Sequence, residues 1–417
     1  MLAIGISRRN QIRAVLLFGI AVGLIALLYL LTISNVDTGA AFRAYHYAAS
    51  ASLAGEPFYG ISAPGYDSTF IYPPVTILFF YPFALIENWR LSFALMTFLN
   101  IVLAIGIAKN VIWFIEIIGE SPPRADRILI VVYSVFSVLT IQVYLQGQIN
   151  SFLALAVIYG FVRLYQDDEH SAGILFALAA LFKYFPALFG IYLIKRRAYR
   201  GIAAAILTGT GFLGLGYLLF GHGVYKNYLQ NVLSSRYIFA DGLSPTVNLV
   251  TFWRPLSYLL PEAGPPIYLL VSAGIMAPIL IYVYLRSTTA VGELIAILVT
   301  SIMIIVVLPS KLPYLVMLHF PLVPLLYLVE DRTVHQTLLV GSVVVCLAFN
   351  LEHVRAVAQI VITSEPIRAA ILRGVEPLFT VATPPLYGLV ILLVACLRYA
   401  YCVGGDSEGC VSKRLNR

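Results

Sequence analysis

The sequence predicts an all-α polytopic membrane protein, and three observations lead to this class. The chain has 417 residues, of which 60% are hydrophobic and only 11% are charged, and its mean hydropathy is +0.89. Soluble domains carry about 25% charged residues. Apolar runs recur along the whole chain, and many approach the ~20 residues of helix that cross a hydrocarbon core of about 30 Å. Helices are expected because a backbone in lipid must satisfy its own hydrogen bonds.

We expect about 12 transmembrane helices, within a range of roughly 11 to 13, in a single domain that covers residues 1–417. The first apolar run is flanked by arginines and lacks a small-residue cleavage site, so we expect a retained helix rather than a signal peptide. The expected spans lie approximately at 14–34, 72–87, from 91 into 109–126, 128–145, 149–165, 172–194, 202–220, 266–285, 292–308, 313–329, 335–350 and 384–400.

One of these spans, 172–194, is interrupted by Lys183 and Pro186. If these residues divide it into two half-spans, the number of crossings becomes odd, and a segment upstream must be re-entrant. The turn at 146–150 would then face outside rather than inside. An even number of crossings favours the unbroken span.

The net charge of +7 is distributed as the positive-inside rule predicts, and it gives no support for nucleic-acid binding. The basic residues gather at the ends of spans: Arg8, Arg9, Arg13, Lys195, Arg196, Arg197, Arg200, Arg286, Lys413, Arg414 and Arg417. This distribution predicts a multi-pass protein of the plasma membrane with both termini in the cytoplasm. Long outward loops are then expected at about 35–72, 221–264 and 351–382.

Lys183 is the most informative charge, because it lies in the middle of the expected span, roughly 16 Å along the helix from either end. A lysine at that depth costs about 3 kcal/mol on insertion scales, so an ionisable residue there suggests a function. Snorkelling to the interface is the simpler explanation, but the distance disfavours it. Pairing with a lipid phosphate or with a buried acid is the better hypothesis.

Asp37 directly follows the first span, at the outer interface. Its carboxylate could cap a helix over Thr38–Ala54, or it could act as a general base, because a carboxylate near lipid can have a raised pKa. Three further cations, Arg236, Arg254 and Lys311, lie in outer loops. Each alone is a typical surface charge, but together they could hold a phosphate.

The sequence contains no metal-ligand cluster, Gly-rich phosphate loop or Ser-His-Asp pattern, so we expect neither a metal nor a cofactor. Many tyrosines crowd the outer loops, and an interfacial aromatic belt explains most of them. Glu56 lies in Gly55-Glu56-Pro57, a typical turn.

Several short motifs in the first half together resemble the polyprenyl-phosphate-mannose-dependent mannosyltransferases of the glycosyltransferase-C superfamily. Beyond residue 200 only hydropathy and loop layout agree. The motifs are Phe42-Arg43-Ala44-Tyr45-His46-Tyr47-Ala48-Ala49, Leu53-Ala54-Gly55-Glu56-Pro57-Phe58-Tyr59, Phe70-Ile71-Tyr72-Pro73-Pro74, Gly147-Gln148-Ile149-Asn150, Ala172-Gly173 and Leu181-Phe182-Lys183-Tyr184-Phe185-Pro186.

The resemblance implies an inverting hexosyltransferase that moves mannose from a polyprenyl- or dolichyl-phosphate-linked donor to a lipid, glycan or protein acceptor on the outer face. An acid in the first outer loop would act as the base. Family members often carry Asp directly before the Phe of the tyrosine motif, where this chain has Ala41, so Asp37 is the expected substitute, one helical turn earlier. Lys183, Arg236, Arg254 and Lys311 are expected at the donor phosphate. The substrate site is expected to be lined by Tyr45, Glu56, Tyr59, Tyr72, Gln148 and Asn150.

Two other functions are compatible with the sequence. A transporter or flippase for a lipid-linked or amphiphilic substrate would also use an intramembrane lysine and a broken helix. Against it, the two halves show no internal repeat, and the polar residues gather on one face. A non-catalytic assembly subunit would leave the long outer loops unexplained.

Overall fold

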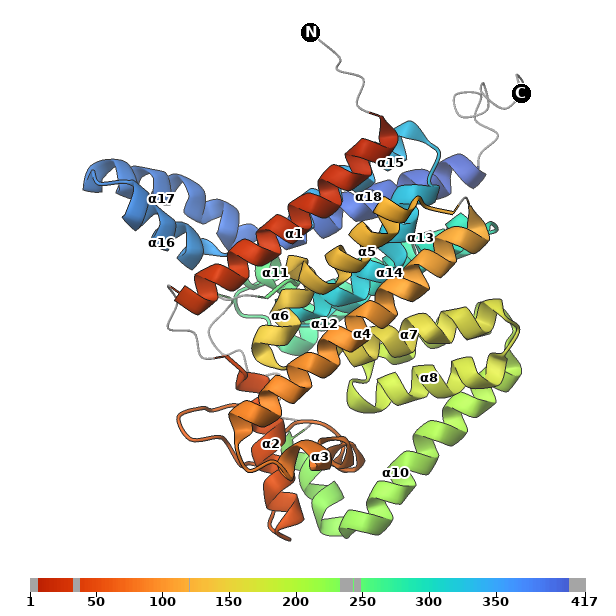
Figure 1. Cartoon of the computed structure of the whole chain (residues 1–417), viewed down its shortest axis with the longest axis vertical. Helices are drawn as coiled ribbons and strands as arrows, with labels where there is room; N and C mark the ends of the chain where they lie inside the picture. Colours follow the sequence, from red (N-terminus) through yellow and green to blue (C-terminus); the bar gives the residue numbers. More distant parts are fainter. Residues whose placement is uncertain (1–6, 33–37, 120, 233–242, 244–248, 405–417) are drawn as a thin grey trace.

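The computed structural model of the chain describes residues 7–32, 38–119, 121–232, 243 and 249–404 (Figure 1). Helices make up most of these ranges, and extended pairing within them is confined to the isolated bridges Ser62–Thr69 and Leu249–Lys311. The predicted all-α class is therefore confirmed.

The chain runs from α1 to α18 with short 3-10 or π-helical segments between. The first half contains α1 (Arg8–Thr32), α2 (Ala40–Leu53), η1 (Pro74–Phe80), α3 (Tyr81–Ala84), α4 (Trp89–Ile118), α5 (Arg124–Phe136), α6 (Val138–Gln146), α7 (Asn150–Tyr165), α8 (Glu169–Phe182), η2 (Phe185–Phe189) and α9 (Gly190–Lys195). The second half contains α10 (Tyr199–Asn227), η3 (Tyr228–Val232), α11 (Trp253–Leu259), α12 (Pro265–Arg286), α13 (Ala290–Val307), η5 (Leu312–Leu318), α14 (His319–Leu328), α15 (Arg332–Cys346), α16 (Leu351–Val361), α17 (Glu365–Val381) and α18 (Pro384–Gly404).

Seven described helices are long and apolar enough to cross a membrane, and the number becomes eight if the bent pair α15 and α16 forms one span. The protein is therefore a multi-pass membrane protein, but the predicted number of about 12 spans is not confirmed. The seven are Arg8–Tyr29, Trp89–Ile118, Arg124–Gln146, Tyr199–Val232, Pro265–Arg286, Ala290–Val307 and Pro384–Val403.

The expected second span, 72–87, is corrected by the structure. This stretch holds only η1, with 7 residues, and α3, with 4 residues. At a rise of about 1.5–2 Å per residue, they are too short to reach across a core of about 30 Å. Pro74 explains where η1 begins, because proline suits the first position of a helix, where its missing N–H would have no partner within the helix.

The expected sixth span, 172–194, is also corrected, because the helix breaks at Lys183. The chain turns back there, so Gly201, beyond α9, lies next to Gly173 near the start of α8. The expected span 172–194 is therefore divided into two half-spans. As expected for that case, the turn at 146–150 lies at the end of the bundle where the chain continues from α1 to α2. With an unbroken span, that turn was expected at the opposite end.

The basic clusters mark the other end of the bundle, near both described chain ends (Figure 1). Arg13 pairs with the buried carboxylate of Asp126 at 2.6 Å, which fixes α1 to α5. Arg196 pairs with Glu293 at 2.7 Å, which fixes the loop after α9 to α13. The clusters thus occupy one end, as the positive-inside pattern predicts, and several of their charges also join helices.

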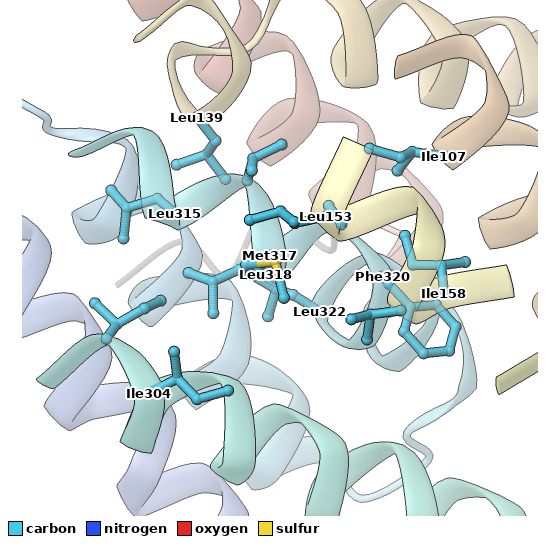
Figure 2. Close-up of a cluster of buried hydrophobic side chains, with 14 of the residues drawn as sticks. Ile107, Leu139, Leu153, Ile158, Ile304, Leu315, Met317, Leu318, Phe320 and Leu322 are labelled. Carbon is cyan, nitrogen blue, oxygen red and sulfur yellow. The ribbon is translucent and has the colours of Figure 1, made fainter. Parts of the chain in front are cut away.

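The centre of the bundle is formed by the short segments η5 and α14 together with the long helix α13, most of whose residues are buried. Figure 2 shows Leu315, Leu318 and Leu322 of η5 and α14 surrounded by side chains of neighbouring helices, such as Leu153 of α7 and Ile304 of α13. All of these side chains are buried. The long helices α1, α4, α10 and α12 lie outside this centre and expose much of their apolar surface, as lipid-facing helices do.

Candidate functional site

The break between α8 and η2 places the ammonium group of Lys183 inside the protein. Lys183 directly follows α8 as its C-cap residue, has an extended backbone (φ −139°, ψ 121°), and is only 7% exposed. Its Nζ donates to Asn150 Oδ1 at 2.6 Å and to Gln148 Oε1 at 3.4 Å. Two predicted substrate residues therefore hold the predicted phosphate-binding lysine.

Two tyrosines extend this network from the first loop. Tyr45 of α2 donates to Gln148 Oε1 at 3.0 Å, and its hydroxyl lies 2.8 Å from that of Tyr72. Burial raises the pKa of the Tyr45 phenol well above its usual range, so this hydroxyl stays protonated. We call Tyr45, Tyr72, Gln148, Asn150 and Lys183 the lysine cluster.

The turn that carries Gln148 is held in one conformation. Gly147 has a left-handed backbone (φ +62°), and a Cβ there would lie 2.5 Å from Phe42 Cβ. Both the conformation and the space require glycine. Asn100 of α4 donates from Nδ2 to the Gln148 carbonyl at 3.2 Å. These contacts fix the side chain of Gln148 between Tyr45 and Lys183.

Sequence reasoning missed Tyr314, whose ring centroid lies 4.2 Å from the Lys183 ammonium. The Tyr72 ring lies at 6.0 Å from the same group. A tyrosine next to proline at the start of a 3-10 helix is the sequence feature that could have found Tyr314. Tyr314 follows Pro313 in η5, and Tyr72 precedes Pro73 and Pro74 at the start of η1. Tyr59, a predicted residue, supports the cluster indirectly, because its hydroxyl donates to the Tyr72 carbonyl at 2.6 Å.

The other predicted site residues are not members of the lysine cluster, and two of them lie outside the residues that the structure describes. Glu56 is exposed after α2, and the side chain of Lys311 is exposed before η5. The buried guanidinium of Arg254 donates to the carbonyl of Phe379 in α17 at 3.4 Å. Asp37 and Arg236 lie outside the described residues, so their expected roles remain predictions.

The start of the first loop is nevertheless tied to the turn of the lysine cluster. Gly39 N, two residues after Asp37, donates to the Leu145 carbonyl at 2.7 Å. The guanidinium of Arg43, one turn into α2, lies 3.9 Å from the Trp89 ring centroid and 4.3 Å from that of Tyr66. These contacts join the loop, α4 and α6 at one end of the bundle.

The lysine cluster combines one buried cation with amide oxygens, amide N–H groups and phenol hydroxyls. An ammonium group attracts a phosphate, while amides and hydroxyls suit the hydroxyl groups of a sugar. Among the described residues, no group of three or more His, Cys, Asp or Glu side chains could hold a metal ion. These groups have the chemistry that could bind an anionic, hydroxyl-rich ligand.

The family model of glycosyltransferase family 87 matches residues 70–309, more than half of the chain. The chain belongs to this family. No curated protein matches it. The family 87 range includes Tyr72, Gln148, Asn150 and Lys183, four of the five members of the lysine cluster. A membrane glycosyltransferase is therefore confirmed, and the mannose and polyprenyl-phosphate specificities remain predictions.

Proposed function

We propose that this family 87 protein transfers a hexose, namely mannose, from a polyprenyl-phosphate-linked donor to a lipid, glycan or protein acceptor. The reaction takes place at the outer face of the plasma membrane, and both termini lie in the cytoplasm. The observation that carries the proposal is the buried Lys183 ammonium, held by Asn150 and Gln148 in a chain that belongs to a glycosyltransferase family.

The proposed place of the donor phosphate is beside Lys183. As the bond between the sugar carbon and the phosphate oxygen breaks, negative charge develops on the leaving polyprenyl phosphate. A preoriented cation in a site with little water stabilises this charge more strongly than water does. Tyr45 and Tyr72 supply neutral hydroxyls next to the cation, and these can bond to the sugar or to the phosphate.

A lipid-linked donor is supported by an apolar groove between α8 and α10. The groove has a volume of about 440 Å³, and its lining includes Leu178, Gly211 and Leu215. Leu178 precedes Lys183 by five residues, about 7.5 Å of helix. Gly216 directly follows Leu215, and a Cβ on it would lie 2.8 Å from Cβ of Val75. Val75 is only three residues after Tyr72 of the lysine cluster. The groove therefore leads toward the lysine cluster and suits a hydrocarbon chain whose phosphate reaches the cation.

The proposed base is Asp37, which precedes the anchored Gly39 by two residues. Its carboxylate takes the proton of the acceptor hydroxyl, whose oxygen then attacks the sugar carbon from the face opposite the phosphate. One carbon–oxygen bond forms and one breaks, and the configuration inverts because the attack comes from the face opposite the leaving phosphate. Polyprenyl phosphate leaves with the electron pair of the broken bond.

The test is a transfer assay with the purified protein in liposomes, a polyprenyl-phosphate-mannose donor and mixed lipid and glycan acceptors. Wild-type protein is expected to form a mannosylated product and free polyprenyl phosphate. Asp37→Asn is expected to lower the rate at least 100-fold, in the range of general-base effects, while donor binding persists. Full activity of Asp37→Asn would remove this residue from the mechanism.

The broken helix at Lys183 also favours a second function, a transporter or flippase for a lipid-linked or amphiphilic substrate, because discontinuous helices are typical of transporters. The same liposomes distinguish the two. A transporter moves the labelled lipid across the bilayer and forms no new glycosidic bond, whereas the proposed enzyme forms product without needing that movement.

A further inference from the structure

The helices α16 and α17 form a hairpin that projects sideways from the helix bundle (Figure 1). The chain bends by 72° between α15 and α16, so α16 runs across the direction of the preceding helix. The hairpin lies at the end that holds the lysine cluster: the ring of Tyr29, near the end of α1, is 5.5 Å from that of His353 in α16.

One face of α17 is apolar and exposed. Ile367 is 56% exposed, Ile371 43%, Leu378 59% and Val381 51%. Steps of four, seven and three residues place these four side chains on one side of an α-helix. The apolar residues of α16 nearest the hairpin turn are exposed as well: Ile360 is 67% and Val361 71% exposed.

Of the four charged residues of α17, Arg373 and Glu376 lie on the other side of the helix, whereas Arg368 lies about 60° around the helix from Ile371. Arg373 and Glu376 follow Ile371 by two and five residues, which places them well away from the apolar face. Arg355 of α16 pairs with Glu376 at 3.4 Å, and both side chains are more than 40% exposed. An exposed pair of this kind contributes at most about 1 kcal/mol. Its position shows that the polar edges of the two helices meet on one side of the hairpin.

The helices that flank the hairpin along the chain, α15 and α18, indicate whether its apolar face meets lipid or water. The hairpin is joined directly to α15 and α18, two apolar helices that pack against each other. Chain segments that leave and re-enter a membrane in this way begin and end at the boundary between hydrocarbon and water. A helix that lies across the spans at that boundary presents its apolar face to acyl chains and its charged face to head groups.

We propose that the α16–α17 hairpin lies in the membrane interface, with Ile367, Ile371 and Leu378 in the acyl-chain region and Arg373 at the head groups. The occupant of the apolar face is therefore the lipid bilayer. Arg254 of α11 donates to the carbonyl of Phe379 in α17, so the hairpin is also linked to α11. This inference does not depend on the proposed donor or sugar.

The test uses spin labels on single cysteines in the full chain, reconstituted in phospholipid nanodiscs. Ile371→Cys and Arg373→Cys are the matched pair on α17, and Val381→Cys gives a second apolar position. Ile275→Cys, 46% exposed within the spanning helix α12, is the lipid reference. Glu56→Cys, in the exposed loop after α2, is the water reference.

Collision with oxygen is expected to exceed collision with a water-soluble nickel complex at positions 371 and 381, as at 275. The order is expected to reverse at 373, as at 56. Equal nickel access at 371 and 373 would show that the face meets water and would overturn the proposal. Protection of 371 and 381 from both reagents would also overturn it, because a second copy or another protein would then cover the face.

Discussion

At the scale of single residues, Lys183 decides what the lysine cluster can bind. A lysine placed within an apolar span usually extends its flexible stem toward the interface. Here the side chain turns inward and ends on two amide oxygens and the Tyr314 ring. Hydrogen bonds to a charged group contribute about 1.5–3 kcal/mol each, which offsets an insertion cost of about 3 kcal/mol. The charge is thereby kept at the site, where a ligand phosphate can use it.

We expect Lys183→Met to raise the KM for a polyprenyl-phosphate-linked donor about 10- to 100-fold, the equivalent of roughly 1.4–2.8 kcal/mol. Methionine keeps the apolar stem but removes the cation that meets the phosphate. Steady-state kinetics at varied donor concentration measure the change. The control is Lys109→Met, at an exposed position of α4, for which no change is expected. An unaltered donor KM in Lys183→Met would exclude its proposed role.

At the scale of elements, the groove between α8 and α10 depends on glycine. Gly209 and Gly211 both lie in α10, and a Cβ at either position meets nothing within 4 Å. Gly211 lines the groove, whereas Gly209 lies about 200° away around the helix. The two positions therefore provide a matched pair for testing whether the groove holds the donor chain.

Gly211→Leu is expected to raise the KM for a long-chain donor about tenfold, or ~1.4 kcal/mol, because the new side chain occupies the space of the hydrocarbon. Gly209→Leu is expected to leave it unchanged. The measurement compares a donor of about ten isoprene units with one of two units, whose KM neither variant should alter. Equal effects of the two substitutions would contradict a donor chain in this groove.

At the scale of the whole molecule, the two ends of the bundle differ in chemistry. One end carries the basic clusters, with Arg13 held by Asp126 and Arg196 by Glu293. The other end carries the lysine cluster, the first loop and the α16–α17 hairpin (Figure 1). Under the proposed function, this arrangement would keep the site on one side of the membrane and the orienting charges on the other.

Cysteine labelling in intact cells tests this arrangement. In a background with Cys402 and Cys410 replaced by serine, Glu56→Cys and Glu87→Cys are both expected to react with an impermeant maleimide from outside. Arg332→Cys, at the basic end, is expected to react only after the membrane is permeabilised. All three positions are exposed, while Cys346 and Cys396 are buried. If Glu87→Cys, like Arg332→Cys, reacted only after permeabilisation, the segment 72–87 would have to cross the membrane after all.

The fold class and the apolar helices could be predicted because they depend on composition and on run length, which are local. The number of crossings could not. Hydropathy does not distinguish a lipid-facing helix from a short one buried inside the bundle, and α14 and η5 are of the buried kind. In the sequence, Lys183 and Pro186 indicate a possible break, but only the contact between α8 and the start of α10 shows which alternative holds.

The sequence by itself determined the membrane class and the basic end, and it pointed to all five members of the lysine cluster, including Tyr45, Tyr72 and Lys183. The tertiary structure decided that these members meet, that Tyr314 joins them, and that the side chains of Glu56 and Lys311 are exposed. The physical reason is that residue type and spacing specify local chemistry. Contacts between Tyr45 and Gln148, which are 103 residues apart, depend on how the helices pack.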